Sequence, residues 1–150
     1  RAYHSWRNAS ILEMLGVPTA HPLLFLEERV FWIFRRRAYF LCEYIEGSDL
    51  ATAWSKQELE TNEKETVALF RDLFRILADY RISHGDMKAT NFLVKEKILH
   101  VLDLDAMVRH RTDVKFKEKF NKDLQRFRKN WLGTLLEPEV DELLSEAAEY

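Results

Sequence analysis

The sequence predicts an α+β fold in which a small β-sheet near the beginning is followed by a mainly helical remainder. Residues 23–45 are rich in aromatic and branched apolar side chains, a composition typical of strands. After residue 60, apolar side chains recur every three or four positions, as they do on the buried face of a helix. A hairpin pattern at residues 92–102 interrupts these helices. The length of 150 residues suits one domain or a large part of one.

Composition and charge exclude several classes of protein. Hydrophobic residues make up 47% and charged residues 32% of the chain, which is typical of a globular protein rather than a disordered one. The net charge of −2 gives no general electrostatic reason to bind nucleic acid, so no nucleic acid is expected as a partner. The single cysteine, Cys42, cannot form an intrachain disulfide, which favours a reducing, cytoplasmic compartment. No apolar stretch is long enough to cross a bilayer.

The first half of the chain predicts one helix and then a sheet. A helix is expected up to Leu15, where Gly16 supplies a stop and Pro18 confirms the break. Two or three strands are expected between Leu23 and Ile45. The cluster Arg35–Arg37 is interpreted as a turn between two of these strands.

The second half predicts four helices and one hairpin. A short helix is expected over Asp49–Trp54, capped by Ser48 or Asp49, and a long one over about Thr61–Arg81. Two strands should follow, joined by the turn Lys95–Lys97, and Pro138 can begin the last helix. The two strands are Phe92–Val94 and Ile98–Leu102. A helical stripe precedes Pro138 and consists of Phe116, Phe120, Leu124, Phe127 and Trp131.

The segment from His84 to Val94 carries the strongest chemical signal. Asp86 and Asn91 are separated by four residues, and a further carboxylate, Asp103, ends the second strand of the predicted hairpin. Phosphoryl transfer needs an aspartate that accepts the hydroxyl proton and hard oxygen ligands that hold magnesium. Asp86 suits the first task, and Asn91 and Asp103 suit the second. Lys88, close to the base, can neutralise the transferred phosphoryl group.

These residues also carry a family resemblance. The stretch HGDMKATNFLV, followed by LDLDAM, resembles the catalytic loop of the protein-kinase-like superfamily. Within it, the sequence is most similar to the lipopolysaccharide core kinases, which phosphorylate heptose or Kdo sugars. The phrase Leu15–Thr19 is also similar to that family. The resemblance implies a protein-kinase-like α+β fold, mainly the helical C-lobe. Residues 1–46 would be a partial N-lobe, a helix and a remnant of its sheet, and 47–150 the C-lobe.

Site residues follow from the resemblance position by position. Asp86 matches the catalytic base and Lys88 the lysine beside it, while Asn91 and Asp103 match the two metal ligands. ATP and Mg²⁺ are therefore the expected cofactors. Asp105 stands where the DFG motif has glycine.

The stretch Cys42–Gly47 resembles the hinge between the two lobes of a kinase. Backbone groups of Glu43 and Ile45 would bond the adenine, with Cys42 at the gatekeeper position. The glycine-rich phosphate loop and the strand lysine that contacts ATP have no counterpart in this sequence. The helix glutamate that pairs with that lysine is also in doubt, because Glu13 lies near the helix end and Asn8 is more central. The expectation is that the upstream part of the N-lobe is cut off.

The expected function is ATP- and magnesium-dependent phosphorylation of a sugar hydroxyl on lipopolysaccharide core. A glycolipid or sugar acceptor would allow peripheral contact with the inner membrane. A protein serine/threonine kinase is one alternative, disfavoured because the link from Asp105 to a helix near Lys115 is short and lacks an Ala-Pro-Glu motif. A non-catalytic pseudokinase or binding module is the other. The basic run 109–119 is interpreted as a solvated face, with attraction of anionic lipid or phosphorylated sugar as the alternative.

Overall fold

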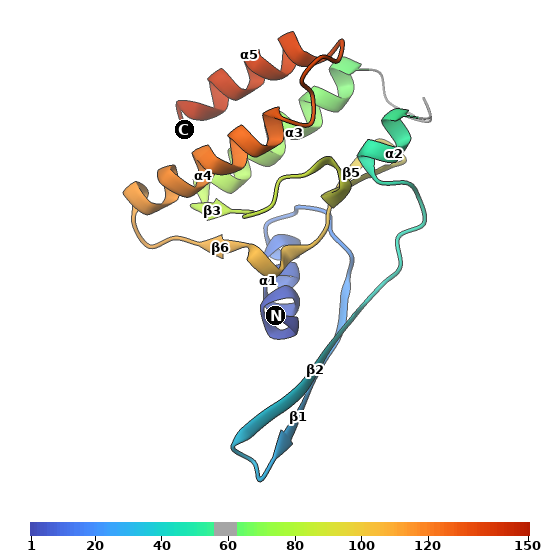
Figure 1. Cartoon of the computed structure of the whole chain (residues 1–150), viewed down its shortest axis with the longest axis vertical. Helices are drawn as coiled ribbons and strands as arrows, with labels where there is room; N and C mark the ends of the chain where they lie inside the picture. Colours follow the sequence, from blue (N-terminus) through green and yellow to red (C-terminus); the bar gives the residue numbers. More distant parts are fainter. Residues whose placement is uncertain (56–62) are drawn as a thin grey trace.

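The computed structural model describes residues 1–55 and 63–150 as a mixture of helices and short two-stranded sheets. Figure 1 shows α3, α4 and α5 together at one end of the molecule, the β1–β2 hairpin projecting from the other, and α1 between them. The helices are α1 (Ala2–Met14), α2 (Leu50–Ser55), α3 (Glu63–Asp79), α4 (Asp113–Arg128) and α5 (Glu137–Ala148). The strands are β1 (Pro22–Val30), β2 (Phe34–Cys42), β3 (Ile82–Ser83), β4 (Phe92–Lys95), β5 (Ile98–Val101) and β6 (Val108–Arg109), with 3₁₀ turns at Ala89–Asn91 and Leu104–Ala106.

The core of the helical part is built on aromatic rings from three elements. Phe70 and Phe74 of α3 meet Phe127 of α4 with ring centroids 4.6 and 5.2 Å apart. Phe92, the first residue of β4, packs edge-on against Phe70 at 5.0 Å. All four side chains are buried. The apolar stripes of the two helices therefore pack against the strand that follows the Asp86–Asn91 segment, and such aromatic pairs add to the free energy of burial.

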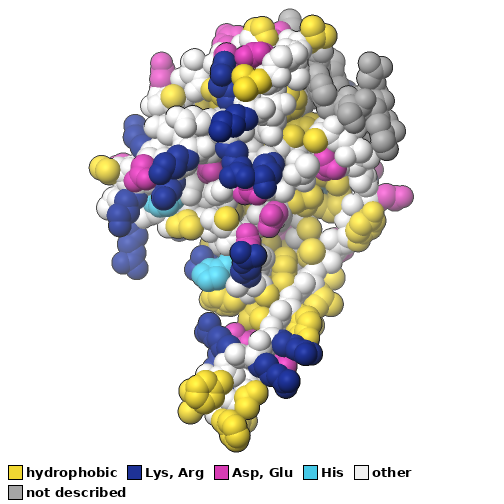
Figure 2. All heavy atoms as spheres, in the orientation of Figure 1, with side chains coloured by type: hydrophobic (Ala, Val, Ile, Leu, Met, Phe, Trp, Pro, Cys, Tyr) yellow, Lys and Arg dark blue, Asp and Glu magenta, His cyan; other side chains and the backbone are white. Residues whose placement is uncertain are grey.

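The β1–β2 hairpin corrects the interpretation of the arginine cluster. Arg35–Arg37 lies within β2, and the turn is formed by Phe31 and Trp32, whose φ angles are positive. Strand geometry suits the arginines because β1 supplies glutamates nearby: Arg35 lies 3.2 Å from Glu27, and Arg36 lies 3.2 Å from Glu28. Figure 2 shows apolar side chains at the exposed tip of this hairpin, with basic side chains behind them.

The predicted elements before the hairpin β4–β5 are confirmed with small shifts at their ends. The opening helix is α1, and two strands occupy the region predicted to hold two or three. Asp49 caps α2, because its Oδ1 accepts the N–H of Thr52 at 3.1 Å. Helix α3 ends at Asp79, two residues before the predicted end, while its predicted start, Thr61, lies outside the described residues.

The elements after α3 include two strands that the sequence did not predict. Strands β3 and β6, of two residues each, pair antiparallel; β3 directly precedes the Asp86 segment, and β6 follows the 3₁₀ turn at Leu104–Ala106. The predicted turn Lys95–Lys97 does join β4 to β5, through left-handed residues Glu96 and Lys97. Pro138 lies in the first turn of α5 as expected. Trp131 lies beyond the end of α4, although it is buried as the stripe predicted.

Two backbone bridges attach the first part of the chain to the hairpin β4–β5. Thr19, just after α1, runs parallel to Val101, and its Oγ1 donates to the Val101 carbonyl at 2.6 Å. Asp49 pairs with Leu93 in β4. The hairpin that carries Asn91 and Asp103 at its ends is thus held from both sides. No helix within the described residues is long and apolar enough to span a membrane.

Candidate active site

Asp86 lies between β3 and the 3₁₀ turn at Ala89–Asn91, where it contacts two cations and an amide. Lys88 Nζ lies 2.9 Å from Asp86 Oδ2. Arg126, from α4, places its Nε 2.8 Å from Oδ1 as an ion pair, without the alignment of a hydrogen bond. The side-chain amide of Asn91 donates to the Asp86 carbonyl at 2.8 Å and to Oδ2 at 3.3 Å. The structure thus brings together three of the residues that the sequence predicted.

The carboxyl group of Asp86 is stabilised in its charged form. Partial burial favours the neutral form, but the hydrogen bond from Lys88, the charge of Arg126 and the amide of Asn91 outweigh it, so the pKa of Asp86 is lowered. Asp86 is consequently ionised at neutral pH and can only accept hydrogen bonds. Such a carboxylate is suited to orienting a hydroxyl group and receiving its proton.

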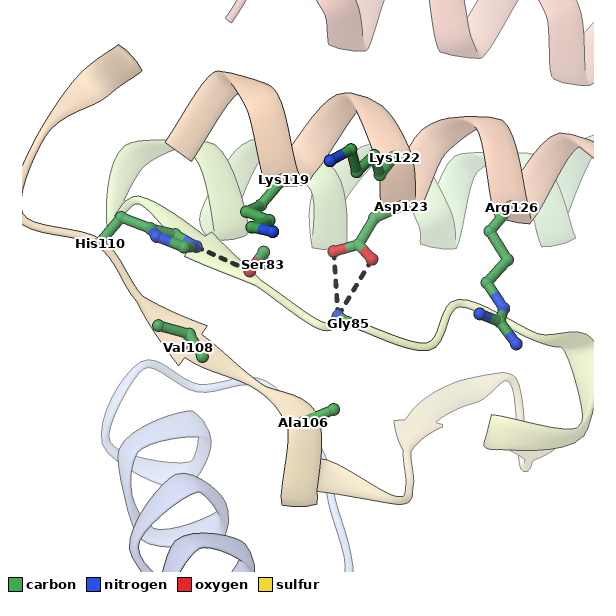
Figure 3. A pocket seen from close by; sticks show the side chains of 9 residues that line it. All are labelled: Ser83, Gly85, Ala106, Val108, His110, Lys119, Lys122, Asp123 and Arg126. Carbon is green, nitrogen blue, oxygen red and sulfur yellow. Dashed lines mark hydrogen bonds between the residues drawn. The ribbon is translucent and has the colours of Figure 1, made fainter. Parts of the chain in front are cut away.

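The backbone next to Asp86 is held by a buried carboxylate on α4 (Figure 3). Asp123 accepts the N–H of His84 at 2.7 Å and the N–H of Gly85 at 3.0 and 3.1 Å. Burial raises the pKa of Asp123, against the opposing effect of these hydrogen bonds. Gly85 has φ +85°, and a Cβ there would lie 2.8 Å from the Cβ and carbonyl oxygen of Ala106. Only glycine fits this conformation at such close approach.

His84 has a structural role in the same loop. Its ring is buried, and Nε2 lies 3.0 Å from the Leu102 carbonyl, to which it must donate. Nδ1 accepts the N–H of Asp86 at 3.3 Å. Only the neutral ring satisfies both partners, and burial lowers the pKa of His84 accordingly. His84 therefore ties the Asp86 loop to the end of β5.

Asn91 and Asp103 stand at the two ends of the β4–β5 hairpin. The Leu102 N–H donates to the Asn91 carbonyl at 2.8 Å, which joins the strand end before Asp103 to the residue before β4. Asp103 is exposed and adopts a left-handed conformation, with φ 52° and ψ 63°. Within the described chain, neither the Asn91 Oδ1 nor the Asp103 carboxylate has a hydrogen-bond or ion-pair partner. Both are hard oxygen donors available to a ligand.

The segment after Asp103 is attached to α1 by Asn8. This side chain is buried and donates to the carbonyls of Leu104 and Met107 at 2.8 and 2.9 Å. Asp105 pairs with Arg1, whose Nε lies 3.4 Å from Asp105 Oδ2. Asn8, which the sequence placed centrally on the opening helix, thus contacts this segment through an amide rather than a carboxylate.

The predicted hinge, Cys42–Gly47, leaves two backbone groups open. The N–H of Glu43 donates to the His21 carbonyl at 2.9 Å. The Glu43 carbonyl and the Ile45 N–H have no hydrogen-bond partner among the described residues. Gly47 lies against Leu93, whose Cδ2 would be 3.3 Å from a Cβ built on the glycine. The hinge segment therefore passes next to β4, the strand that follows Asn91.

The sequence also matches a known protein family. The profile of the lipopolysaccharide kinase (Kdo/WaaP) family matches residues 1–146. The chain belongs to this family. The resemblance inferred from the Asp86 segment is thus confirmed, and the family is one of kinases.

Solved structures give the same fold for this lipopolysaccharide kinase family member. The chain is similar to a structure described as WaaP in complex with acyl carrier protein, with a TM-score of 0.71 and 19% sequence identity. The similarity covers 99% of this chain and 66% of that one, so the chain spans just under two thirds of the WaaP chain. No curated protein matches the sequence.

Three contacts of this family member were missed by the sequence interpretation. Arg126, Asp123 and Asn8 contact the Asp86 loop or its neighbours from distant helices. One signal was available for Asp123: it lies at helical spacing between Phe120 and Phe127, on the apolar face of its helix. A carboxylate at such a buried position needs specific hydrogen-bond donors. Nothing in the sequence pattern distinguishes Arg126 from the other basic residues of α4.

The donor set fits the metal that the kinase family implies. Mg²⁺ prefers oxygen ligands and is usually bound by few protein groups together with substrate phosphates. Asn91 Oδ1 and the Asp103 carboxylate meet that requirement. Within the described residues, no group of three or more His, Cys, Asp and Glu side chains could hold a metal by itself. A site of one carboxylate and one amide would depend on the nucleotide for its remaining ligands.

Proposed function

We propose that this chain is the core of an ATP- and Mg²⁺-dependent kinase that phosphorylates a sugar hydroxyl of lipopolysaccharide core. One observation carries the proposal: the ionised Asp86 lies within ion-pair distance of Lys88 and Arg126 and beside Asn91. This combination of a base, a cation and an amide on one short loop is what phosphoryl transfer requires. Membership of the lipopolysaccharide kinase family supports the class of acceptor.

In this proposal Asp86 orients the acceptor hydroxyl and takes its proton. Its lowered pKa keeps it ionised at neutral pH, so it is ready to accept a hydrogen bond from the sugar. Lys88 is half exposed and leaves the Asp86 carboxylate by rotation about its flexible stem. Lys88 then stabilises the negative charge of the phosphoryl group in flight. Arg126 remains with Asp86 and keeps its carboxylate charged.

The nucleotide would be held by the hinge and the hairpin ends. The Glu43 carbonyl and the Ile45 N–H offer one acceptor and one donor to adenine, as the kinase resemblance implies. Asn91 and Asp103 would hold Mg²⁺, which would neutralise charge on the phosphates of ATP. Because the Asn91 Nδ2 donates to the Asp86 carbonyl, the Asn91 Oδ1 is directed away from the base. In lobe terms, residues 1–46 belong to the N-lobe and 47–150 to the C-lobe.

A sugar rather than a peptide acceptor is favoured by the short connection after the hairpin. Only β6 and a brief loop separate the 3₁₀ turn at Leu104–Ala106 from α4. This leaves no room for the activation segment on which protein kinases bind a peptide. A lipopolysaccharide acceptor would also bring the protein to the cytoplasmic face of the inner membrane.

The test is transfer of labelled phosphate from ATP to lipopolysaccharide core by the full-length protein. Asp86→Asn should lower kcat by about 10²- to 10⁴-fold while ATP affinity stays unchanged, since only the base is lost. Asp72→Asn, an equal change at an exposed site on α3, serves as the control. Transfer to a protein substrate instead would identify a protein kinase. Absence of both ATP binding and transfer would identify a non-catalytic module.

A further inference from the structure

Two hollows lie beside Asp86 on the side of α4, and both are lined by basic side chains. The first, of about 450 Å³, is formed by loop residues such as Gly85 and Ala106 together with Lys119, Lys122 and Arg126 (Figure 3). The second, of about 540 Å³, adjoins it because the two share Lys122 and Arg126. Its lining consists of Lys88, Lys122, Gln125, Arg126, Lys129 and Asn130.

The basic residues of these hollows form one stripe on the helix. Lys119, Lys122, Arg126 and Lys129 recur every three or four positions, so they project from one face of α4 and its C-terminal cap. Lys88 belongs to the Asp86 loop and lines the same second hollow. We call these five residues the basic groove. The other two lysines of α4, Lys115 and Lys117, precede this stripe and line neither hollow.

Few carboxylates neutralise the basic groove. Asp123 lines the first hollow, but both its oxygens are bonded to the backbone N–H groups of the loop. Glu118 lies 2.8 Å from Lys122 and 3.9 Å from Lys119, yet it is exposed, and such a surface pair is easily exchanged for another anion. The second hollow has no carboxylate in its lining. Asp86 pairs with Lys88 and Arg126 and offsets one positive charge, so the five cations of the groove still outnumber their carboxylates and create a positive potential beside Asp86.

We propose that the basic groove binds an anionic group of the acceptor, a carboxylate or phosphate on the sugar region that carries the reacting hydroxyl. The inference rests on the proposed function and names the acceptor's chemistry. Lys88 and Arg126 line the groove and also pair with Asp86, so an anion bound at Lys122 and Lys129 holds its sugar within reach of the base. A neutral sugar gains nothing from this groove. The kinase therefore selects acceptors that are already negatively charged.

Binding of delipidated core oligosaccharide to the full-length protein tests the groove without any need for turnover. The double variant Lys122→Ala/Lys129→Ala should bind intact oligosaccharide about tenfold more weakly, a loss of about 1.4 kcal/mol. Lys115→Ala/Lys117→Ala removes the same charge from the same helix outside both hollows and should bind as the wild type does. The wild-type affinity should also fall with rising salt, because charge pairing is screened.

Modified oligosaccharides identify the anion. Dephosphorylated oligosaccharide should lose affinity if the group is a phosphate, and carboxyl-reduced oligosaccharide should lose it if the group is a sugar carboxylate. The double variant Lys122→Ala/Lys129→Ala should bind intact oligosaccharide and oligosaccharide that lacks this anionic group with the same affinity. Equal wild-type binding of oligosaccharide that lacks both groups would overturn the proposal, as would unchanged binding by the double variant.

Kinetics separate this inference from the proposed function. The double variant should raise KM for the acceptor about tenfold while KM for ATP stays unchanged, since only acceptor contacts are lost. An unchanged acceptor KM would reject the groove and leave the kinase assignment intact. Failure of the wild type to phosphorylate any lipopolysaccharide core would reject the proposed function instead. The oligosaccharide titrations would then still decide whether Lys122 and Lys129 bind anions.

Discussion

Arg126 Nε lies 2.8 Å from Asp86 Oδ1, and one turn earlier on the same helix Asp123 accepts hydrogen bonds from the backbone of Gly85. Helix α4 thus fixes both the charge and the backbone position of the proposed base. A side chain held from a rigid helix is positioned more accurately than one that depends on its loop alone. The aromatic contact between Phe127 and Phe70 in turn fixes α4 against α3.

Removal of Arg126 should raise the pKa of Asp86. Burial already opposes ionisation of this carboxyl, and the charge of Arg126 is among the effects that outweigh burial, so Arg126→Gln moves the pKa upward. The carboxyl carbon of Asp86, followed by NMR in metal-free buffer, reports its titration midpoint. Arg128→Gln is a matched control, since Arg128 pairs with Asp141 on α5. An unshifted midpoint in the Arg126 variant would show that this ion pair does not form in solution.

Loss of the Asp123 carboxylate should destabilise the fold. In Asp123→Ala the backbone N–H groups of His84 and Gly85 lose their acceptor, at a cost of about 1–3 kcal/mol for each buried group left unpaired. The free energy of unfolding should fall by about 2–6 kcal/mol in urea titrations. Asp123→Asn keeps one oxygen acceptor and should lose less. Asp113→Ala, on the same helix as Asp123, removes only an exposed ion pair with Arg81 and should lose much less stability.

Gly85 and Gly16 allow backbone strain to be separated from steric conflict. Both have positive φ, but a Cβ on Gly85 would meet Ala106 at 2.8 Å, whereas one on Gly16 would meet nothing within 4 Å. Gly16→Ala should cost about 1–2 kcal/mol of stability from its left-handed backbone alone. Gly85→Ala adds the overpacking and should cost about 1–3 kcal/mol more. If the two variants lost the same free energy of unfolding, the segment at Ala106 would have moved aside at no cost to accommodate the Cβ on residue 85.

The sequence predicted what is encoded locally. The spacing of Asp86 and Asn91, with Lys88 between them, is set by a few consecutive residues, and the structure brings these three side chains into contact. The apolar stripe of α4 likewise predicts, from nearby residues alone, which face of this helix is buried. Strands β3 and β6 were missed because two residues are too few to show a period, and they form only through their pairing.

The features that the sequence did not predict depend on contacts between distant parts of the chain. Asn8 and Arg126 acquire their roles only when the helices that carry them pack beside the Asp86 loop. The misread cluster Arg35–Arg37 has the same cause, because the glutamates that accommodate it in a strand lie on the other arm of the hairpin. The charge of the cluster suggested a turn, but the pairing of its arginines with glutamates on β1 allows it to lie within β2.

Protonation of His84 should make the fold less stable as the pH falls. Burial lowers the pKa of the folded ring, against the attraction of Asp123 and nearby carboxylates, so the folded protein binds fewer protons than the unfolded chain. The stabilisation is complete above the unfolded value of about 6.5 and is lost below it, by up to about 1.4 kcal/mol per pH unit. His110, whose pKa burial also lowers, acts in the same direction, whereas the raised pKa of Asp123 acts in the opposite one.

His84→Gln isolates this contribution, because glutamine can still donate to the Leu102 carbonyl but does not titrate. Urea unfolding between about pH 7.5 and 5.5 should show a smaller loss of stability in this variant than in the wild type. His110→Gln, at a less buried ring, should reduce the slope less. If His84→Gln lost stability with pH as steeply as the wild type, the buried ring would not be the group that takes up the proton.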